Sequence, residues 1–205
     1  MGKVILFDYD GTILNSMDVV YKEYNKIAVK YKMKKVASFK DFMNLYDTNI
    51  YDSFFKLGLD KNKTKEFISD FRRPLIEADD KLHLFDKMDE VVEKISKKHL
   101  VIVITSNVTE VVEYSIKNHA VKGVSEVIGG DKEISKVKKI KSIIEKYPKS
   151  QIYYVGDTKG DIVESKKIGA IAVAVTWGHH SKKKLSDAGA DYIVDKPEEL
   201  LNILC

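Results

Sequence analysis

The chain has 205 residues, of which 44% are hydrophobic and 32% charged, so it is long enough and apolar enough to bury a globular core. Its 35 basic and 31 acidic side chains give a formal net charge of +4, and the lysines are too dispersed to indicate a nucleic-acid-binding surface. The single cysteine, Cys205, excludes an internal disulfide, and no apolar run approaches the roughly 18 residues of a membrane helix.

The beginning of the chain predicts a cytoplasmic protein. The segment from Val4 to Asp10 is typical of a strand with an acidic end, and it lacks the basic region and long apolar run of a signal peptide. A mild basic excess would help to attract an anionic ligand. We expect neither nucleic acid nor a membrane as a partner, and either a monomer or a homodimer.

The first predicted element is a buried strand that ends in two carboxylates. Val-Ile-Leu-Phe at 4–7 is followed by Asp8, Tyr9, Asp10, Gly11 and Thr12. Side chains two positions apart on an extended chain project to the same side, and ligand sites in parallel sheets lie at the carboxyl ends of the strands. Such oxygen ligands suit Mg²⁺. The alternative is an ordinary acidic turn, because Asp and Gly are common turn residues.

Residues 15–81 show helical periodicity and no convincing strand, which predicts an all-helical insertion. The first helix is indicated by an apolar stripe at Val20, Tyr24, Ile27, Ala28 and Tyr31. Ser38 is a candidate cap for a second helix, and the apolar residues at 50–55 indicate a third. A fourth pattern covers Phe67–Ile76, where Pro74 should start, kink or end the helix.

From residue 84 onward, strand-like runs alternate with helical patterns, which indicates a parallel sheet covered by helices on both faces. The predicted strands are Leu100–Ile104, Ile152–Val155, Ile171–Val175 and Tyr192–Val194. The predicted helices are Asp89–Lys97, Thr109–Lys117, Lys136–Lys146, Gly160–Ile168, Ser181–Ala188 and Pro197–Leu204.

Polar residues follow two of these strands. Thr105, Ser106 and Asn107 come directly after the strand at 100–104, where Ser106 and Asn107 could also cap the next helix. Asp157 and Asp161 follow the strand at 152–155 and are separated by one helical turn, so both can face one pocket. Favourable placement near a helix N-terminus is the alternative for Asp161.

These motifs resemble those of the haloacid dehalogenase superfamily, in which a hydrophobic strand precedes Asp-x-Asp-Gly-Thr and a later strand precedes Gly-Asp-x-x-x-Asp. The resemblance implies that Asp8 attacks phosphorus to form an aspartyl-phosphate. It implies that Asp10 protonates the leaving oxygen and later activates water. Thr105 would donate a hydrogen bond to the phosphoryl group. We expect further substrate contacts from Gly11, Thr12, Ser106 and Asn107.

The resemblance also implies a magnesium ion and a lysine in the site. Mg²⁺ would be held by Asp8, Asp157 and the backbone carbonyl of Asp10, with Asp161 acting behind them or through water. The family's lysine, which neutralises phosphoryl charge, usually starts a helix between the second and fourth motifs. Lys136 fits that position best, and its competitors are Lys132, Lys138 and Lys139.

The C-terminal segments, which include Val175–His180, look most like the phosphoglycolate phosphatase-like branch with a helical cap. We expect His179 and His180 to lie in an exposed loop. Asp47 and Asn49 occupy a region where some relatives carry a basic residue, which weakens a specific assignment to phosphoglycolate. Anion clamping is one interpretation of Arg72 and Arg73, and coverage of a helix surface is the other.

The expected protein is thus an α/β enzyme with a Rossmann-like, doubly wound parallel sheet. Its catalytic core would comprise residues 1–14 and 82–205, and a helical cap would comprise residues 15–81. The expected activity is Mg²⁺-dependent hydrolysis of a small phosphorylated metabolite, a phosphomonoester. The alternatives are a phosphomutase, a dehalogenase, against which Asp10 argues, and a non-enzymatic phosphate-binding protein.

Overall fold

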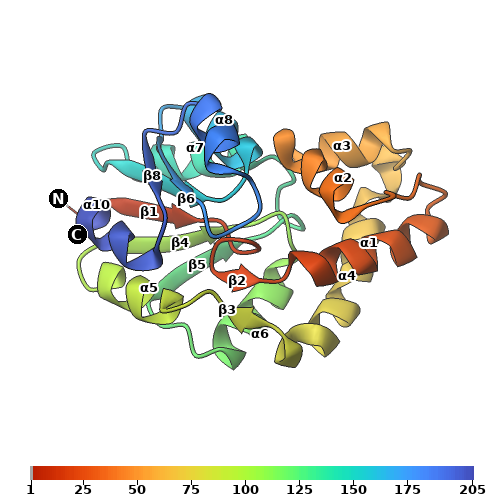
Figure 1. Cartoon of the computed structure of the whole chain (residues 1–205), viewed down its shortest axis with the longest axis horizontal. Helices are drawn as coiled ribbons and strands as arrows, with labels where there is room; N and C mark the ends of the chain where they lie inside the picture. The colour runs from red at the N-terminus through yellow and green to blue at the C-terminus, as the bar shows by residue number, and fades with distance from the viewer. Residues whose placement is uncertain (1) are drawn as a thin grey trace.

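The computed structural model describes residues 2–205 and is built around a six-stranded parallel sheet with the order β5-β4-β1-β6-β7-β8 (Figure 1). The strands are β1 (Val4–Phe7), β4 (Leu100–Ile104), β5 (Val124–Ile128), β6 (Ile152–Gly156), β7 (Ile171–Val175) and β8 (Tyr192–Val194). The strand β1 lies in the middle of the sheet. The strands β4 and β5, which come next in the sheet along the chain, lie on one side of β1, and β6, β7 and β8 lie on the other side. The doubly wound α/β fold predicted from the sequence is therefore confirmed.

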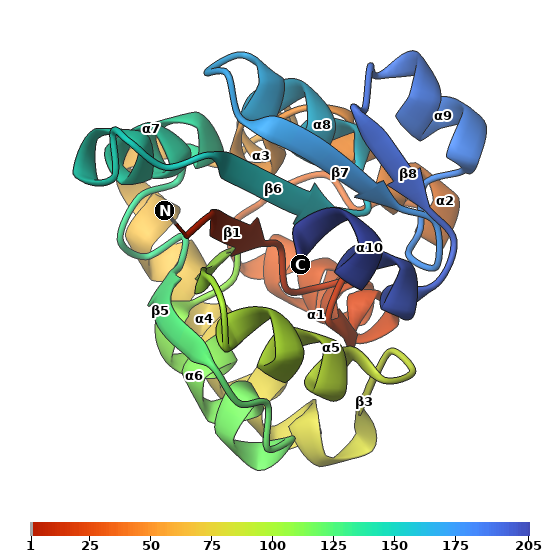
Figure 2. The ribbon, with the colours of Figure 1, turned by 90° about the vertical axis from the view of Figure 1, so that its left-hand side faces the viewer.

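Helices cover both faces of the sheet because neighbouring residues of each buried strand point to opposite faces. Ile5 and Phe7 of β1 belong to a core that includes residues of α5 (Met88–Ser96), α6 (Thr109–Asn118) and α10 (Leu200–Leu204). Val4 and Leu6 pack on the other side with α7 (Lys136–Lys146). The same face continues under α8 (Lys159–Lys166) and α9 (Lys182–Asp187) (Figure 2).

The helices inserted after the first motif form their own apolar cluster. They are α1 (Met17–Lys30), α2 (Phe39–Asn44), α3 (Ile50–Lys56) and α4 (Thr64–Ala78), with short 3-10 turns η1 (Leu45–Asp47), η2 (Lys61–Lys63) and η3 (Asp79–Lys81). Their cluster includes Tyr24, Phe42, Phe54 and Phe67 and extends to Val111 of α6. The chain enters and leaves this part through an antiparallel ribbon of β2 (Leu14–Asn15) and β3 (His83–Leu84).

Two features of the secondary structure were not settled by the sequence. Of the three roles predicted for Pro74, starting and ending a helix are excluded, since α4 runs from Thr64 to Ala78 with Phe71 and Leu75 buried on either side of the proline. The strand β5 was not predicted. It lies at the sheet edge, where Ser125 and Glu126 interrupt its apolar pattern.

The remaining boundaries agree closely with the sequence predictions. The bounds of β4, β7, β8 and α7 were predicted to the residue, and Ser38 caps α2 by accepting a hydrogen bond from the backbone N–H of Asp41. The last predicted helix is divided into η4 (Pro197–Glu199) and α10.

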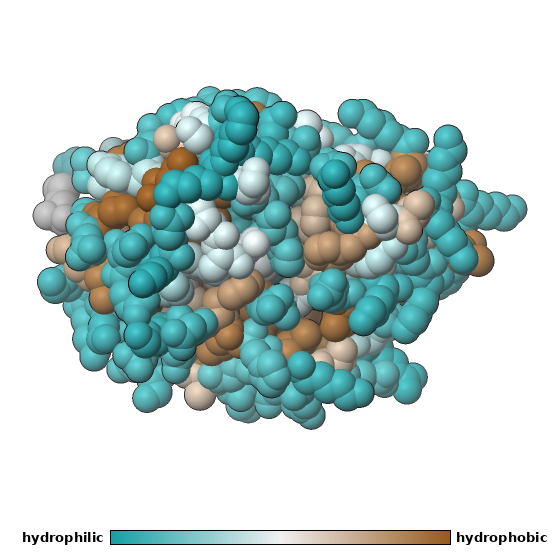
Figure 3. Space-filling view, in the orientation of Figure 1, coloured by the Kyte–Doolittle hydropathy of each residue, from teal (hydrophilic) through white to brown (hydrophobic). Residues whose placement is uncertain are grey.

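The hydropathy of the surface is consistent with the burial of apolar side chains in these clusters. The face in Figure 3 is largely hydrophilic, with hydrophobic residues in small, separate patches. None of the helices within residues 2–205 combines the length and apolar character needed to cross a membrane.

Candidate active site

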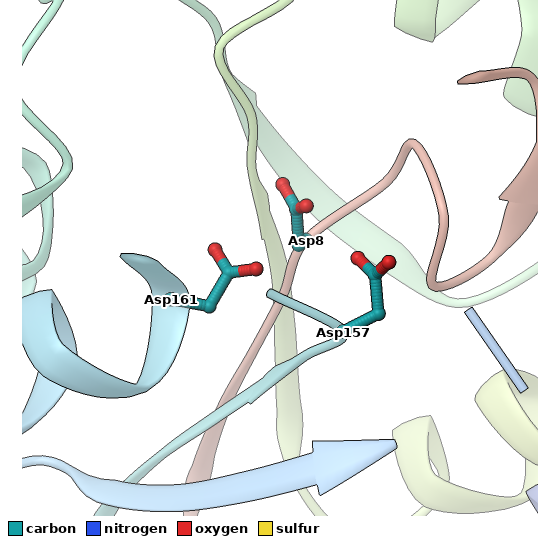
Figure 4. A group of neighbouring side chains, drawn as sticks. All are labelled: Asp8, Asp157 and Asp161. Atoms are coloured by element: carbon teal, nitrogen blue, oxygen red, sulfur yellow. The ribbon is translucent and has the colours of Figure 1, made fainter. Parts of the chain in front are cut away.

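Three buried carboxylates meet at the carboxyl end of the central strands. Asp8 follows β1, Asp157 follows β6, and Asp161 lies in the first turn of α8 (Figure 4). One oxygen from each lies within 4.8 Å of the others. Adjacent parallel strands end at the same edge, and the first turn of α8 returns over it, so residues distant in sequence become neighbours. A set of oxygen donors only fits a hard divalent cation such as Mg²⁺.

Lys136 is the cation placed among these carboxylates. Its Nζ lies 3.0 Å from Oδ1 of Asp8 and 2.5 Å from Oδ1 of Asp161, and all three side chains are buried. Lys136 starts α7, whose cap is the Ser135 side chain. The competing lysines have other partners. Lys132 donates to the Val127 carbonyl, and Lys138 is an exposed lysine near Glu133.

Asp161 is held in position by its own helix terminus. Its Oδ2 accepts hydrogen bonds from the backbone N–H and the hydroxyl of Thr158, at 3.1 and 2.6 Å, and this forms a capping box at the start of α8. Its Oδ1 faces Lys136 and accepts from the Tyr154 hydroxyl at 3.2 Å. Asp161 therefore both caps α8 and contacts the buried ammonium of Lys136.

Asp157 is fully buried, and each of its carboxylate oxygens has a hydrogen-bond donor nearby. Its Oδ2 accepts from the backbone N–H of His179 at 2.9 Å, and the Thr12 hydroxyl lies 3.4 Å from Oδ1. Burial, with a contribution from the negative charge of Asp161, raises the pKa of Asp157 to about 7. Burial likewise raises the pKa of Asp8, although Lys136 opposes the change. Carboxylates this desolvated would be favoured in their ionised forms by a bound cation.

Gly11 and Thr12 lie on the Asp157 side of the site. Gly11 has a φ of +87°, and a Cβ there would stand 2.6 Å from Oδ2 of Asp157, so the turn requires glycine both for its backbone and for space. Thr12 is completely buried, and its carbonyl accepts from the indole of Trp177. Neither residue lines the cavity described below.

Asp10 stands on the other side of Asp8, with its carboxylate held by two side chains. Oδ1 accepts from the Ser16 hydroxyl at 2.5 Å, and Oδ2 accepts from the Asn107 amide at 3.0 Å. Burial raises the pKa of Asp10, and these two hydrogen bonds limit the rise. A raised pKa suits a group that must both give and take a proton.

The end of β4 supplies the third wall of the site. The Thr105 hydroxyl accepts from the backbone N–H of Asn107 at 2.9 Å, which leaves its own proton available for another acceptor. Lys139, nearly fully buried, donates to the Thr105 carbonyl at 2.5 Å. Burial and the nearby charge of Lys136 lower the pKa of Lys139 to about 7.

A cavity of about 60 Å³ opens between this site and the inserted helices. Of the residues predicted for the site, those that line it are Asp8, Asp10, Thr105, Ser106, Asn107 and Lys136. Asp157 and Asp161 are not part of this lining, although Asp161 lies near Tyr46, Thr48 and Ile50 of the inserted segment. The structure thus separates the predicted residues into a carboxylate cluster and a cavity lining that share Asp8.

The inserted helices contact the core directly beside the site. The Tyr51 hydroxyl donates to the Ser106 carbonyl at 2.5 Å, and the Asn49 amide donates to the Ile134 carbonyl at 3.0 Å and to Glu164 at 3.2 Å. At Gly160 a Cβ would stand 2.6 Å from the Tyr46 carbonyl, so glycine allows this close approach.

The structure corrects the interpretation of His180 and decides between the two interpretations of Arg72 and Arg73. His180 is buried rather than exposed: its Nδ1 accepts from the backbone N–H of Lys159, and its Nε2 lies 2.9 Å from the Met43 carbonyl. Arg72 and Arg73 do not clamp an anion at the cavity. They pair with Glu110 and Glu77 on the surface.

Several residues of the site were not found from the sequence. Ser16, Tyr51 and Tyr154 contact the predicted groups, and each belongs to a pattern that also fits ordinary capping or packing. Lys139 was considered only as a competitor of Lys136, and it contacts the Thr105 carbonyl instead. For Ser16, its position immediately before the predicted first helix was the one usable signal, because serine often precedes a helix.

Comparison with known proteins agrees with this geometry. Residues 5–175 match the family model of haloacid dehalogenase-like hydrolases. A phosphoglycolate phosphatase from Synechococcus elongatus is 24% identical over 203 residues, which cover 97% of this chain and 95% of that protein. The pyrophosphatase PpaX of Bacillus mycoides is 25% identical over 209 residues, which cover 98% and 95%.

Solved structures show the same fold. A predicted phosphatase from Clostridium acetobutylicum superimposes with a TM-score of 0.80 at 20% identity, over 99% of this chain and 98% of that one. At this identity the likeness concerns the fold alone. The family model, however, spans most of the chain, including the first and last carboxylate motifs. The chain therefore belongs to the haloacid dehalogenase-like hydrolase family.

Proposed function

We propose that the protein is a Mg²⁺-dependent phosphatase that hydrolyses a small phosphomonoester through an aspartyl-phosphate on Asp8. The observation that carries this proposal is the position of Asp8, which contacts Lys136 on one side and opens to the cavity on the other. The names of the relatives, a phosphoglycolate phosphatase and a pyrophosphatase, support phosphate chemistry.

In the first half of the reaction, a carboxylate oxygen of Asp8 bonds to phosphorus while the ester oxygen leaves. Asp10 gives its proton to that oxygen, for which its raised pKa is suited. Lys136 and the Thr105 hydroxyl would stabilise the negative charge on the phosphoryl oxygens. Ser106 and Asn107 are also proposed to contact the phosphoryl group, since they line the same wall.

In the second half, the Asp10 carboxylate takes a proton from water, and the water oxygen bonds to phosphorus. The bond between phosphorus and the Asp8 oxygen breaks, which releases phosphate and restores Asp8. Asp8, Asp157 and the backbone carbonyl of Asp10 are the proposed ligands of Mg²⁺, which would supply further positive charge opposite the phosphoryl group. Asp161 would hold Lys136 in place.

We also propose that residues 15–81 act as a cap over a core formed by residues 1–14 and 82–205. Support comes from the β2–β3 ribbon, through which the chain enters and leaves the helices, and from the Tyr51 contact beside the site. A cap of this kind excludes water from the reacting groups and admits substrate when it opens.

The mechanism is tested by trapping the phosphorylated protein. An Asp10→Asn variant, given Mg²⁺ and an aryl phosphate whose leaving group needs no protonation, should retain phosphorylation and lose dephosphorylation. Acid quenching followed by peptide mass spectrometry should then locate one phosphoryl group on Asp8. The double variant Asp8→Asn/Asp10→Asn is the matched control and should carry none. Phosphorylation at another residue, or wild-type turnover by Asp8→Asn, would contradict the mechanism.

A further inference from the structure

The cavity beside Asp8 has two walls of opposite character. The core contributes the carboxylates of Asp8 and Asp10, the ammonium of Lys136 and the polar end of β4. Much of the wall from the inserted helices is aliphatic or aromatic, and it includes Ile50, Phe54, Phe67, Ile68, Phe71 and Leu75. The last four share a face of α4 because they recur at helical spacing.

Positive charge is confined to the core wall. Among residues 2–205, Lys136 is the one lysine or arginine in the cavity lining, and it is already engaged by Asp8 and Asp161. Two arginines of α4 follow the cavity-lining residue Phe71 in the sequence, and both pair with carboxylates outside the cavity lining. Arg72 pairs with Glu110, and Arg73 is exposed and pairs with Glu77.

The neutral polar groups on the helical wall are few. Two tyrosines line the cavity, Tyr46 and Tyr51. The Tyr51 hydroxyl already donates to the Ser106 carbonyl, so among the described residues Tyr46 is the lining tyrosine whose hydroxyl can still donate to a substrate. Burial raises the pKa of Tyr46, so this group stays a neutral phenol. A second anionic group on the substrate would therefore lose its water and gain no opposing charge, which is unfavourable in an apolar site.

We propose that the substrate is a phosphate monoester whose alcohol portion is small and apolar, rather than a compound with a second anionic group, such as phosphoglycolate or pyrophosphate. This inference rests on the proposed phosphatase function. The core wall would bind the phosphoryl group, and the face of α4 would bury the hydrocarbon part of the leaving alcohol. Apolar burial of this kind contributes affinity in proportion to the area removed from water.

The test compares two substrates of similar size and branching. Isobutyl phosphate differs from phosphoglycolate in that two methyl groups replace the two carboxylate oxygens. With Mg²⁺ and wild-type protein, kcat/KM for isobutyl phosphate should exceed that for phosphoglycolate by about tenfold or more. Equal values, or a preference for phosphoglycolate, would overturn the inference and leave the phosphatase proposal intact. Failure to hydrolyse either compound or phenyl phosphate would overturn both.

A pair of variants tests the physical reason. Val20, half-buried in α1, lines the cavity, whereas Val29 of the same helix is exposed. Val20→Lys should shift the kcat/KM ratio toward phosphoglycolate by about tenfold, because it adds a cation to the apolar wall. Val29→Lys should leave the ratio unchanged.

Thermal melting checks that both variants are folded, and the wild-type comparison does not depend on them. An unchanged ratio in a folded Val20→Lys protein would show that missing charge does not set the preference, which contradicts the proposal.

Discussion

Nζ of Lys136 lies 3.0 Å from Oδ1 of Asp8, although the two residues are 128 positions apart in the sequence. Both side chains are buried, and the same ammonium also contacts Asp161. Lys136 therefore fixes the geometry around Asp8 and compensates negative charge in a region poor in water. Removal of Lys136 would leave the buried carboxylates of Asp8 and Asp161 without this counterion.

Lys136→Met is expected to lower kcat/KM for a phosphate ester by about 100-fold or more, because a charge that stabilises the transferring group is lost. The matched control is Lys138→Met, which removes an exposed lysine from the same helix and should have nearly wild-type activity. Steady-state kinetics of both variants provide the measurement. Similar losses in both would assign the effect to general charge rather than to the contact with Asp8.

Asp157 should make the stability of the metal-free protein depend on pH. Its pKa of about 7 in the folded state is above the ordinary aspartate value, so the folded state is favoured by protonation. Relative to Asp157→Asn, the wild-type protein should lose up to roughly 4 kcal/mol of unfolding free energy between pH 4 and pH 7. Urea unfolding in the presence of a chelator measures this difference.

Magnesium should reverse that loss. If the ion binds the ionised carboxylates, added Mg²⁺ should stabilise the wild-type protein more at pH 7.5 than at pH 5. Asp157→Asn should show a weaker response at both values. A Mg²⁺ effect independent of pH and of residue 157 would place the ion elsewhere.

Lys139 should have the opposite dependence. Its folded-state pKa of about 7 is below the ordinary lysine value, so the folded state disfavours its charged form. The free energy of unfolding of the wild type, relative to Lys139→Met, should therefore rise by up to roughly 5 kcal/mol between pH 7 and pH 10. Lys141→Met, at an exposed position of α7, should follow the wild-type curve. Coincident wild-type and Lys139→Met profiles would mean that Lys139 is not desolvated.

Gly160→Ala should separate the inserted helices from the core. The new methyl group would meet the Tyr46 carbonyl at 2.6 Å and the Thr48 carbonyl at 3.0 Å, and backbone atoms cannot rotate away as a side chain can. We expect KM to rise several-fold and stability to fall by about 1–3 kcal/mol. Kinetics and urea unfolding measure the two effects. Unchanged values for both would show that η1 is free to move from α8 at no cost.

The strands and their polar ends were largely predictable because those signals are local. A run such as Leu100–Ile104 is apolar at every position and is followed by polar residues, so both the strand and the site edge can be recognised from consecutive residues. The strand β5 lacked such a signal, since at the sheet edge Glu126 needs no burial. The local pattern left open whether Pro74 starts, kinks or ends a helix, and the tertiary structure places it inside α4.

By itself, then, the sequence determined the class of fold and the residues gathered at the strand ends, including Asp8, Asp10 and Asp157. Only the tertiary structure decided that Lys136 contacts Asp8, while Lys139 binds the Thr105 carbonyl and Lys138 faces solvent. It also decided that an apolar face of α4 lines the cavity. The physical reason is that burial of a lysine, or exposure of a phenylalanine to a cavity, depends on partners brought together from distant parts of the chain.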